Sequence, residues 1–292
     1  MELFNTNEAN SQIYRNVRDS DTPMMIRARQ LCLNMWKTYE PYADEHFVTE
    51  FQRDFSARFW EMDLTCILLE LGKGIECPKP GPDIKVDNSI WIEAISPTQG
   101  NEDSPDRVPE IVTGIATSID SDLIALRYTA SVEEKHRKYH RYIEAGIITN
   151  DEPYIIALNS SQIPGASLEL PMPRIVSALL SIGSQYVEFD RESGDVVGGG
   201  YHYKETVAKS NGANVPIDMF HNPDYAGISA VLYSNSDCCN RAEKNGSGYI
   251  LVHNPLAKNP IRVGFLGVGR EAVTTIDSET DYSISWVNHE PA

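Results

Sequence analysis

Two carboxylates lie close together in the stretch Gly81–Pro97, which reads GPDIKVDNSIWIEAISP. The Asp-Asn-Ser in its middle is typical of a turn between two short apolar runs, so a β-hairpin is the economical interpretation. Asp83 opens the first run and Glu93 lies inside the second. Side chains alternate along a strand, so Glu93 shares a face with Trp91 and Ile95 in an otherwise apolar strand.

A carboxylate in such a strand needs a partner. Burying it alone costs roughly several kcal/mol, and the remedies are a cation, a metal ion or protonation. If the second strand folds back beside the first, Asp83 and Glu93 converge at one end of the hairpin. Two converging, half-buried carboxylates make a plausible site for a hard divalent cation.

This motif resembles the core of the PD-(D/E)XK nuclease superfamily, the fold of many restriction endonucleases. The family pattern is Pro-Asp, a variable gap, then an acid, any residue and lysine. Here Pro82-Asp83 is followed after nine residues by Glu93-Ala94-Ile95. Ile95 therefore stands where the family has its lysine, which puts catalytic activity in question.

The resemblance implies further ligands for one or two Mg²⁺ or Mn²⁺ ions beside Asp83 and Glu93. The main-chain carbonyl of Ala94 would be one of them. A helix just before the hairpin often supplies an acid to the metal, and the apolar spacing of residues 56–71 predicts such a helix with Glu61 at the edge of its buried stripe. The alternative is a surface glutamate paired with Arg58, three residues earlier.

A lysine on a neighbouring helix could replace the missing one, as in some relatives of this superfamily. The sequence predicts a helix over 131–145, with Ser131 as N-cap of a capping box. Lys135 is the one cation on its apolar and aromatic stripe, and Lys138 is the second choice for the role. The alternative is a structural lysine whose stem packs on Tyr139.

The resemblance implies Mg²⁺-dependent hydrolysis of phosphodiester bonds, with DNA as the expected substrate. Asp83 and Glu93 would hold the metal, and Lys135 would orient or deprotonate the attacking water or stabilise the phosphorane. Basic residues of the same helix, Arg137, Lys138 and Arg141, would contact the nucleic-acid backbone, which positions a substrate without reading its sequence.

Composition limits the function and leaves alternatives open. Of 292 residues, 41% are hydrophobic, enough for a sizeable core, and the formal charge of −17 is unfavourable for binding a phosphate backbone. A catalytically degenerate nuclease fold that acts as a binding or scaffolding module in a larger complex is therefore the alternative function, and an unrelated α/β metalloenzyme is a third. A protein partner or a second copy of the chain could bring so acidic a protein to DNA.

The apolar runs, the N-terminal segment and the cysteine count indicate the cellular compartment and the state of the thiols. No run of eighteen apolar residues occurs, and the N-terminus does not read as a signal peptide, so we expect a cytoplasmic protein without a membrane partner. Five cysteines without a CxxC spacing favour reduced thiols. Two zinc sites are weaker alternatives: Cys238-Cys239 joined by His221 or His253, and the His136 and His140 pair.

The expected fold class is α/β, with a restriction-endonuclease-like core: a central mixed β-sheet flanked by helices, plus an N-terminal helical region and a C-terminal α+β extension. The predicted divisions are an N-terminal helical cap (1–55), the nuclease-like core (56–163) and the extension (164–292). Expected strands include 154–158, 227–233, 248–253 and 261–266. The extension could continue the core sheet, cover its face or form a domain of its own.

Overall fold

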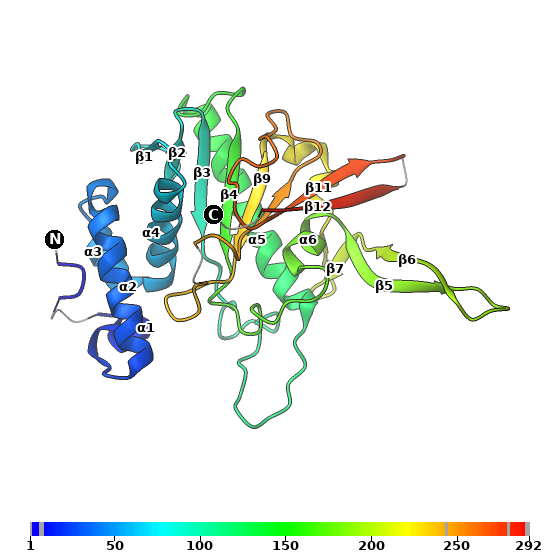
Figure 1. The fold of residues 1–292 in the computed structure, drawn as a ribbon, viewed down its shortest axis with the longest axis horizontal. Helices are drawn as coiled ribbons and strands as arrows, with labels where there is room; N and C mark the ends of the chain where they lie inside the picture. Colours follow the sequence, from blue (N-terminus) through cyan, green and yellow to red (C-terminus); the bar gives the residue numbers. More distant parts are fainter. Residues whose placement is uncertain (1, 6–8, 243–244, 279–280, 290–292) are drawn as a thin grey trace.

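A single mixed sheet organises the chain. The computed structural model describes residues 2–5, 9–242, 245–278 and 281–289. Eight strands form the sheet in the order β1-β2-β3-β4-β9-β10-β11-β12 (Figure 1). Their bounds are β1 Ile75–Glu76, β2 Ile84–Val86, β3 Ile90–Ile95, β4 Tyr154–Asn159, β9 Ala230–Ser234, β10 Ile250–His253, β11 Arg270–Ile276 and β12 Tyr282–Asn288. The α/β class with a mixed sheet flanked by helices is thus confirmed.

The predicted hairpin is confirmed with the expected strand bounds. β2 and β3 are antiparallel, and the turn between them places Asp87 and Asn88 at positive φ (49° and 56°). These two residue types tolerate the left-handed region because their short polar side chains can bond locally. β3 then pairs in parallel with β4. Parallel neighbours require a long crossover, and α5 (Ser121–Glu144) lies within it.

Helix α4 (Phe55–Glu70) packs on one face of the sheet. Its Trp60, Leu64 and Leu68 belong to a core with apolar side chains of β2, β3, β4, β9 and β10, and the Trp60 indole donates a 2.9 Å hydrogen bond to the carbonyl of Ala157 in β4. The helix predicted over 56–71 is therefore present, with Asp54 as its N-cap.

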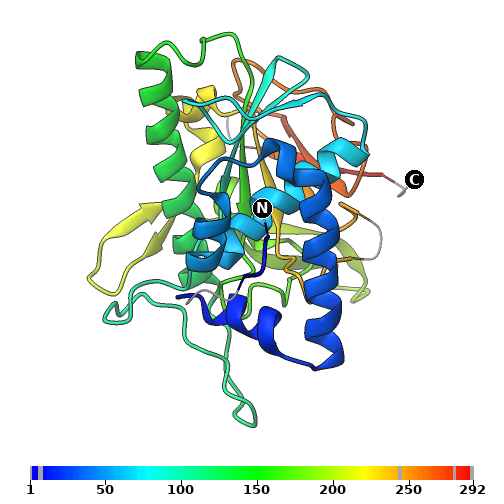
Figure 2. The same cartoon turned by 90° about the vertical axis from the view of Figure 1, so that its left-hand side faces the viewer.

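Helix α5 packs on the opposite face. Ile124, Tyr128, Val132 and Tyr139 are its main contributions to a second core, which also contains apolar residues of β4, β9 and β10. The predicted start at Ser131 is wrong. The helix begins ten residues earlier because the Asp120 side chain caps it, and the Ser131 hydroxyl instead donates to the carbonyl of Arg127 inside the helix. Figures 1 and 2 show α5 (green) on the side of the molecule away from α2 (blue).

The N-terminal residues form a helical layer with its own core. It comprises α1 (Gln12–Asp19), α2 (Pro23–Tyr39), the 3-10 turn η1 (Glu40–Tyr42) and α3 (Phe47–Arg53), all packed beside α4. Thr22 caps α2 with Pro23 at the first helical position. Residues 43–46 are irregular, and α3 spans seven residues.

The C-terminal half extends the same sheet through β9 to β12, so the first of the three alternatives for this region is observed. The strands predicted over 227–233 and 248–253 are present. The strand predicted over 261–266 is wrong, since those residues are loop and turn and the next strand is β11. Elements outside the sheet are α6 (Arg174–Leu179), the hairpin β5 (Ile182–Phe189) and β6 (Val196–Tyr203), the pair β7 (Thr206–Ala208) and β8 (Asn214–Pro216), and the 3-10 turns η2 (Met219–His221) and η3 (Pro223–Gly227).

Two further features complete the fold. The β5-β6 hairpin projects from the body of the molecule (Figure 1), and large apolar side chains along it are exposed, among them Phe189, Val196, Val197 and Tyr203.

Among the helices that the structure describes, none is long and apolar enough to cross a membrane.

Replacing Leu64 with alanine tests the packing of α4 on the sheet. The side chain is fully buried, so we expect the free energy of unfolding to fall by about 2 to 5 kcal/mol through lost burial and a residual cavity. Leu168→Ala is the control, because that leucine is 58% exposed and its loss should change stability by no more than about 0.5 kcal/mol. Urea unfolding measures both. Equal, small effects would contradict the packing described.

Candidate active site

Asp83 and Glu93 meet across the β2-β3 hairpin. Ile84 pairs with Ile92, so Asp83, one residue before β2, stands opposite Glu93. The Oδ2 atom of Asp83 accepts a 2.7 Å hydrogen bond from the backbone N–H of Ala94. Both carboxylates line one cavity of about 430 Å³, which lies between α4, α5 and the hairpin.

Glu93 is fully buried and surrounded by donors from α5. Its Oε1 lies 3.0 Å from Nζ of Lys135 and 2.5 Å from Nζ of Lys138. The Tyr142 hydroxyl lies 3.3 Å from Oε2 and 2.9 Å from the carbonyl oxygen of Gly81, so its single proton serves these two acceptors. A buried carboxylate is tolerated only when charges and hydrogen bonds compensate it, and here α5 supplies both.

The spacing along α5 explains why one helix delivers all three donors. Residues three and four apart share a face of a helix, and Lys135, Lys138 and Tyr142 follow that spacing. The Lys135 side chain is 11% exposed, and the Lys138 side chain is 34% exposed. Burial disfavours the charged form of Lys138, yet attraction by the Glu93 carboxylate outweighs it and raises the pKa of Lys138.

Asp83 has a strongly raised pKa in this cavity. Burial raises its pKa to about 7, and repulsion by Glu93 and Glu61 acts in the same direction. The hydrogen bond from Ala94 and the charge of Lys135 oppose this shift only in part. A buried carboxyl that carries a proton near neutral pH is a typical feature of sites that bind cations or transfer protons.

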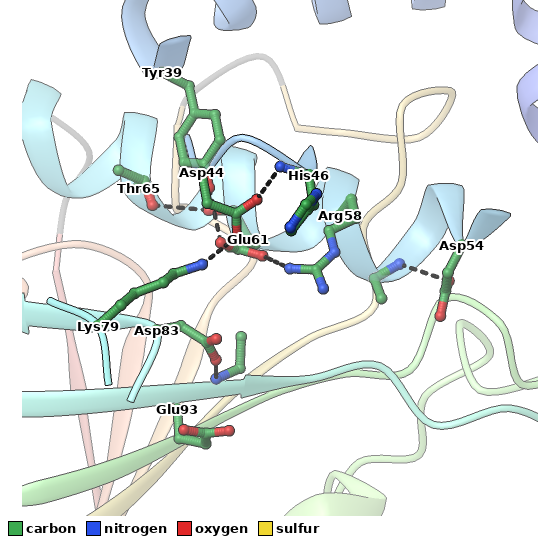
Figure 3. A network of polar contacts seen from close by, with 12 residues as sticks. Tyr39, Asp44, His46, Asp54, Arg58, Glu61, Thr65, Lys79, Asp83 and Glu93 are labelled. Atoms are coloured by element: carbon green, nitrogen blue, oxygen red, sulfur yellow. Dashed lines mark hydrogen bonds and ion pairs between the residues drawn. The ribbon is translucent and has the colours of Figure 1, made fainter. Parts of the chain in front are cut away.

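Glu61 lies on α4 across the cavity. Its Oε1 accepts a 2.7 Å hydrogen bond from the Tyr39 hydroxyl, and its Oε2 lies 2.5 Å from a guanidinium nitrogen of Arg58. Figure 3 shows Glu61, Asp83 and Glu93 in succession from α4 to β3. Glu61 therefore lines the cavity and also makes the predicted ion pair with Arg58.

The three carboxylates do not form a closed metal-binding cluster in this structure. Within the described ranges, the one group of three or more His, Cys, Asp or Glu ligand atoms that all lie within 4.8 Å of one another is Asp237, Cys238 and Cys239. Lys135 and Lys138 are paired with Glu93, and the Tyr39 hydroxyl is hydrogen-bonded to Glu61. Oxygen ligands of the kind Mg²⁺ prefers are present, and Mg²⁺ commonly binds one or two carboxylates with waters and substrate phosphates. The chemistry of Asp83 and Glu93 therefore fits such an ion, and direct ligation by Glu61 stays a prediction.

The cavity wall is more basic than the whole chain. Arg58, Arg127, Lys135 and Lys138 stand among five carboxylates, which are Asp54, Glu61, Asp83, Glu93 and Glu134. Of the three residues predicted to contact a nucleic-acid backbone, Lys138 lines the cavity and Arg137 and Arg141 do not. Arg127 was not predicted to line the site, because the helix was expected to begin after it. Since α5 begins at Ser121, Arg127 lies eight residues before Lys135 and about two turns away on the same face.

The remaining residues considered from the sequence lie as follows. Ile95 lines the cavity and packs against the core on the α5 side. His136 and His140 face each other with 3.0 Å between their Nε2 atoms, and His136 also lies 3.1 Å from the carbonyl oxygen of Asp224. Of the histidines considered as partners of Cys238-Cys239, His253 instead pairs with Glu271 at 2.7 Å.

Comparisons of the chain with protein-family models, with curated proteins and with solved structures found no match.

The raised pKa of Asp83 predicts a pH-dependent effect of Asp83→Asn in the metal-free protein. The folded state binds a proton at Asp83 up to about pH 7, whereas the unfolded chain releases it near pH 4, so this residue costs stability increasingly as pH rises between those values. Asparagine carries no charge and keeps an acceptor for the Ala94 N–H. Below about pH 4 the two proteins should be equally stable.

Above pH 7 we expect Asp83→Asn to be more stable than the parent chain by an amount on the order of 2 to 4 kcal/mol. Thermal unfolding from pH 4 to 8, in chelator, measures the difference. A stability difference that stays constant across that range would contradict the burial of Asp83.

Proposed function

We propose that the chain is a metal-dependent nuclease that hydrolyses phosphodiester bonds, with DNA as the first substrate to test and a role in defence or repair. The observation that carries the proposal is the meeting of Asp83 and Glu93 in one open cavity with the Lys135 ammonium, which reaches Glu93 from α5. An ammonium on a neighbouring helix then stands in for the lysine that Ile95 replaces. The restriction-endonuclease-like form of the α/β fold is part of the same proposal.

Charge in the cavity supports a divalent cation followed by phosphate. Four cationic side chains face five carboxylates, an excess of one negative charge when all are ionised. One Mg²⁺ or Mn²⁺ would reverse that sign and favour an anionic substrate. When bound, the ion would acidify water and neutralise charge on the phosphate. Two carboxylates with remaining sites for water and substrate are its usual protein environment.

The chain's own residues supply the rest of the mechanism. Asp83 and Glu93, with the Ala94 carbonyl by resemblance, would hold the cation. Lys135, the less exposed of the two lysines, would as an ammonium orient the attacking water or donate to a phosphorane oxygen, and only as the neutral amine would it accept a proton from that water; these roles require a fixed position in a partly dry site. Lys138 and Arg127 lie nearer to solvent and would bind substrate phosphates, which positions the strand.

Conservative replacement of the two hairpin acids tests the proposal directly. We expect Asp83→Asn and Glu93→Gln each to reduce Mg²⁺-dependent cleavage of DNA by at least about 10²-fold, because each loses a ligand charge while keeping the shape of the side chain. Glu152→Gln is the matched control. Glu152 pairs with Lys85 at 2.9 Å outside the cavity, so its loss should leave cleavage unchanged. Circular dichroism checks that every variant is folded.

Full cleavage by either hairpin variant would remove this cavity from consideration as the active site.

Replacing Lys135 and replacing Lys138 should have different effects on the reaction. We expect Lys135→Met to lower the maximal rate about 10²-fold with little change in substrate binding. Lys138→Met should weaken DNA binding and, because Lys138 competes with the cation for Glu93 Oε1, should tighten Mn²⁺ binding to the DNA-free protein. Calorimetric Mn²⁺ titration and single-turnover kinetics measure these effects. Identical behaviour of the two variants would contradict the division of roles.

A degenerate nuclease fold that acts as a binding module is the second candidate. The ion pairs that occupy Glu93 in this structure favour it, together with the net charge of −17. A stable Lys–Glu network can replace a metal as the partner of a buried carboxylate. If this candidate is correct, Mg²⁺ and Mn²⁺ should not raise the unfolding temperature, and no cleavage should occur at any metal concentration.

A further inference from the structure

A second group of metal-ligating side chains lies outside the candidate active site, in the loop after β9. Asp237, Cys238 and Cys239 place one carboxylate oxygen and two sulfurs within 4.8 Å of one another. The turn itself holds them together, since Asp237 Oδ1 accepts hydrogen bonds from the backbone N–H of Cys239 (2.7 Å) and of Asn240 (2.9 Å). This arrangement does not depend on the proposed nuclease function.

The buried side of the group faces the N-terminal helical layer. The Cys32 thiol on α2 is fully buried and raises the pKa of the nearby Cys238, although it does not lie within 4.8 Å of all three ligand atoms of the group. Cys238 belongs to the same hydrophobic core as α1 to α4. Cys239, by contrast, is exposed, so a cation could enter from that side. The group therefore lies against a helical layer formed by residues about two hundred positions earlier in the sequence.

The distances suit a soft, tetrahedral cation. The sulfurs of Cys238 and Cys239 are 3.8 Å apart. Zinc binds thiolate sulfur at about 2.3 Å in tetrahedral geometry, which places two such sulfurs about 3.8 Å from each other. Thiolates with a carboxylate select zinc over Mg²⁺ or Ca²⁺, which prefer oxygen ligands alone.

We propose that Asp237, Cys238 and Cys239 form a binding site for a thiophilic divalent cation of the zinc class, with water completing its coordination. Binding there would fix the loop after β9, whose Cys238 packs in the core of the N-terminal helical layer. Arg241, two residues after Cys239, already holds this loop to α4 through a 2.6 Å ion pair with Asp63.

Proton release accompanies this binding. A cysteine thiol carries its proton at neutral pH, and only the thiolate binds a metal ion. Each sulfur that becomes a ligand loses its proton to the buffer, and the cation accepts its electron pair. One cation therefore displaces at least two protons.

Cobalt titration of the untagged, reduced full-length chain tests the site, because Co²⁺ reports thiolate ligation and tetrahedral geometry in its absorption spectrum. We expect one equivalent of Co²⁺ to give thiolate charge-transfer bands and strong visible bands, and Zn²⁺ to displace it. Calorimetry of Zn²⁺ binding in two buffers of different ionisation enthalpy should show release of at least two protons. Zinc should also raise the unfolding temperature.

Cys239→Ser is the decisive variant, because its exposed side chain can change without disturbing the core. It should weaken cobalt binding at least tenfold and remove the tetrahedral spectrum, as should Asp237→Asn to a smaller extent. Cys77→Ser is the matched control, a half-buried thiol outside the cluster, and should keep the spectrum. A weak octahedral spectrum with the parent chain, an unchanged spectrum with Cys239→Ser, or a lost one with Cys77→Ser would overturn the proposal.

Discussion

The burial of Glu93 is the constraint on which the candidate site depends. A carboxylate with no exposed surface, in the middle of a sheet, requires compensating charge within hydrogen-bonding distance. Helix α5 meets that requirement with two ammonium groups and a hydroxyl on one face. Because β3 and β4 are parallel, their connection must cross the sheet, and the crossover helix α5 lies over the face that carries Glu93. The strand topology and the need to compensate a buried charge thus both place α5 over Glu93.

The surroundings of Asp83 extend this arrangement across the hairpin. Glu93 and Glu61 repel its charge, burial removes water, and one backbone N–H stabilises it. The result is that Asp83 holds a proton up to about pH 7 beside Glu93, whose carboxylate two lysines contact. A divalent cation would replace both the proton on Asp83 and part of the lysine charge on Glu93, which gives the site a physical reason to bind one.

Sequence patterns predicted the helices and strands that are determined by neighbouring residues in the chain. The hairpin followed from turn residues between apolar runs, α4 from the spacing of its apolar residues and β4 from its apolar run. The start of α5 did not, because Ser131 and Glu134 form a credible capping box inside a longer helix whose true cap is Asp120. The exposed β5-β6 hairpin was also missed, since its glycine-rich strand resembles a turn. Lys135 could be singled out as a cation on an apolar stripe, but the second lysine on Glu93, the Tyr39–Glu61 contact and the proximity of Cys32 to Cys238 require tertiary structure.

The most direct test of the account is an anomalous-scattering map from crystals of the chain soaked in Mn²⁺. We expect a peak between the carboxylates of Asp83 and Glu93, with Lys138 displaced from Glu93 and Lys135 still beside it. A map without density at this position, in crystals whose cavity is open to solvent and with both lysines still paired to Glu93, would contradict the proposed metal centre.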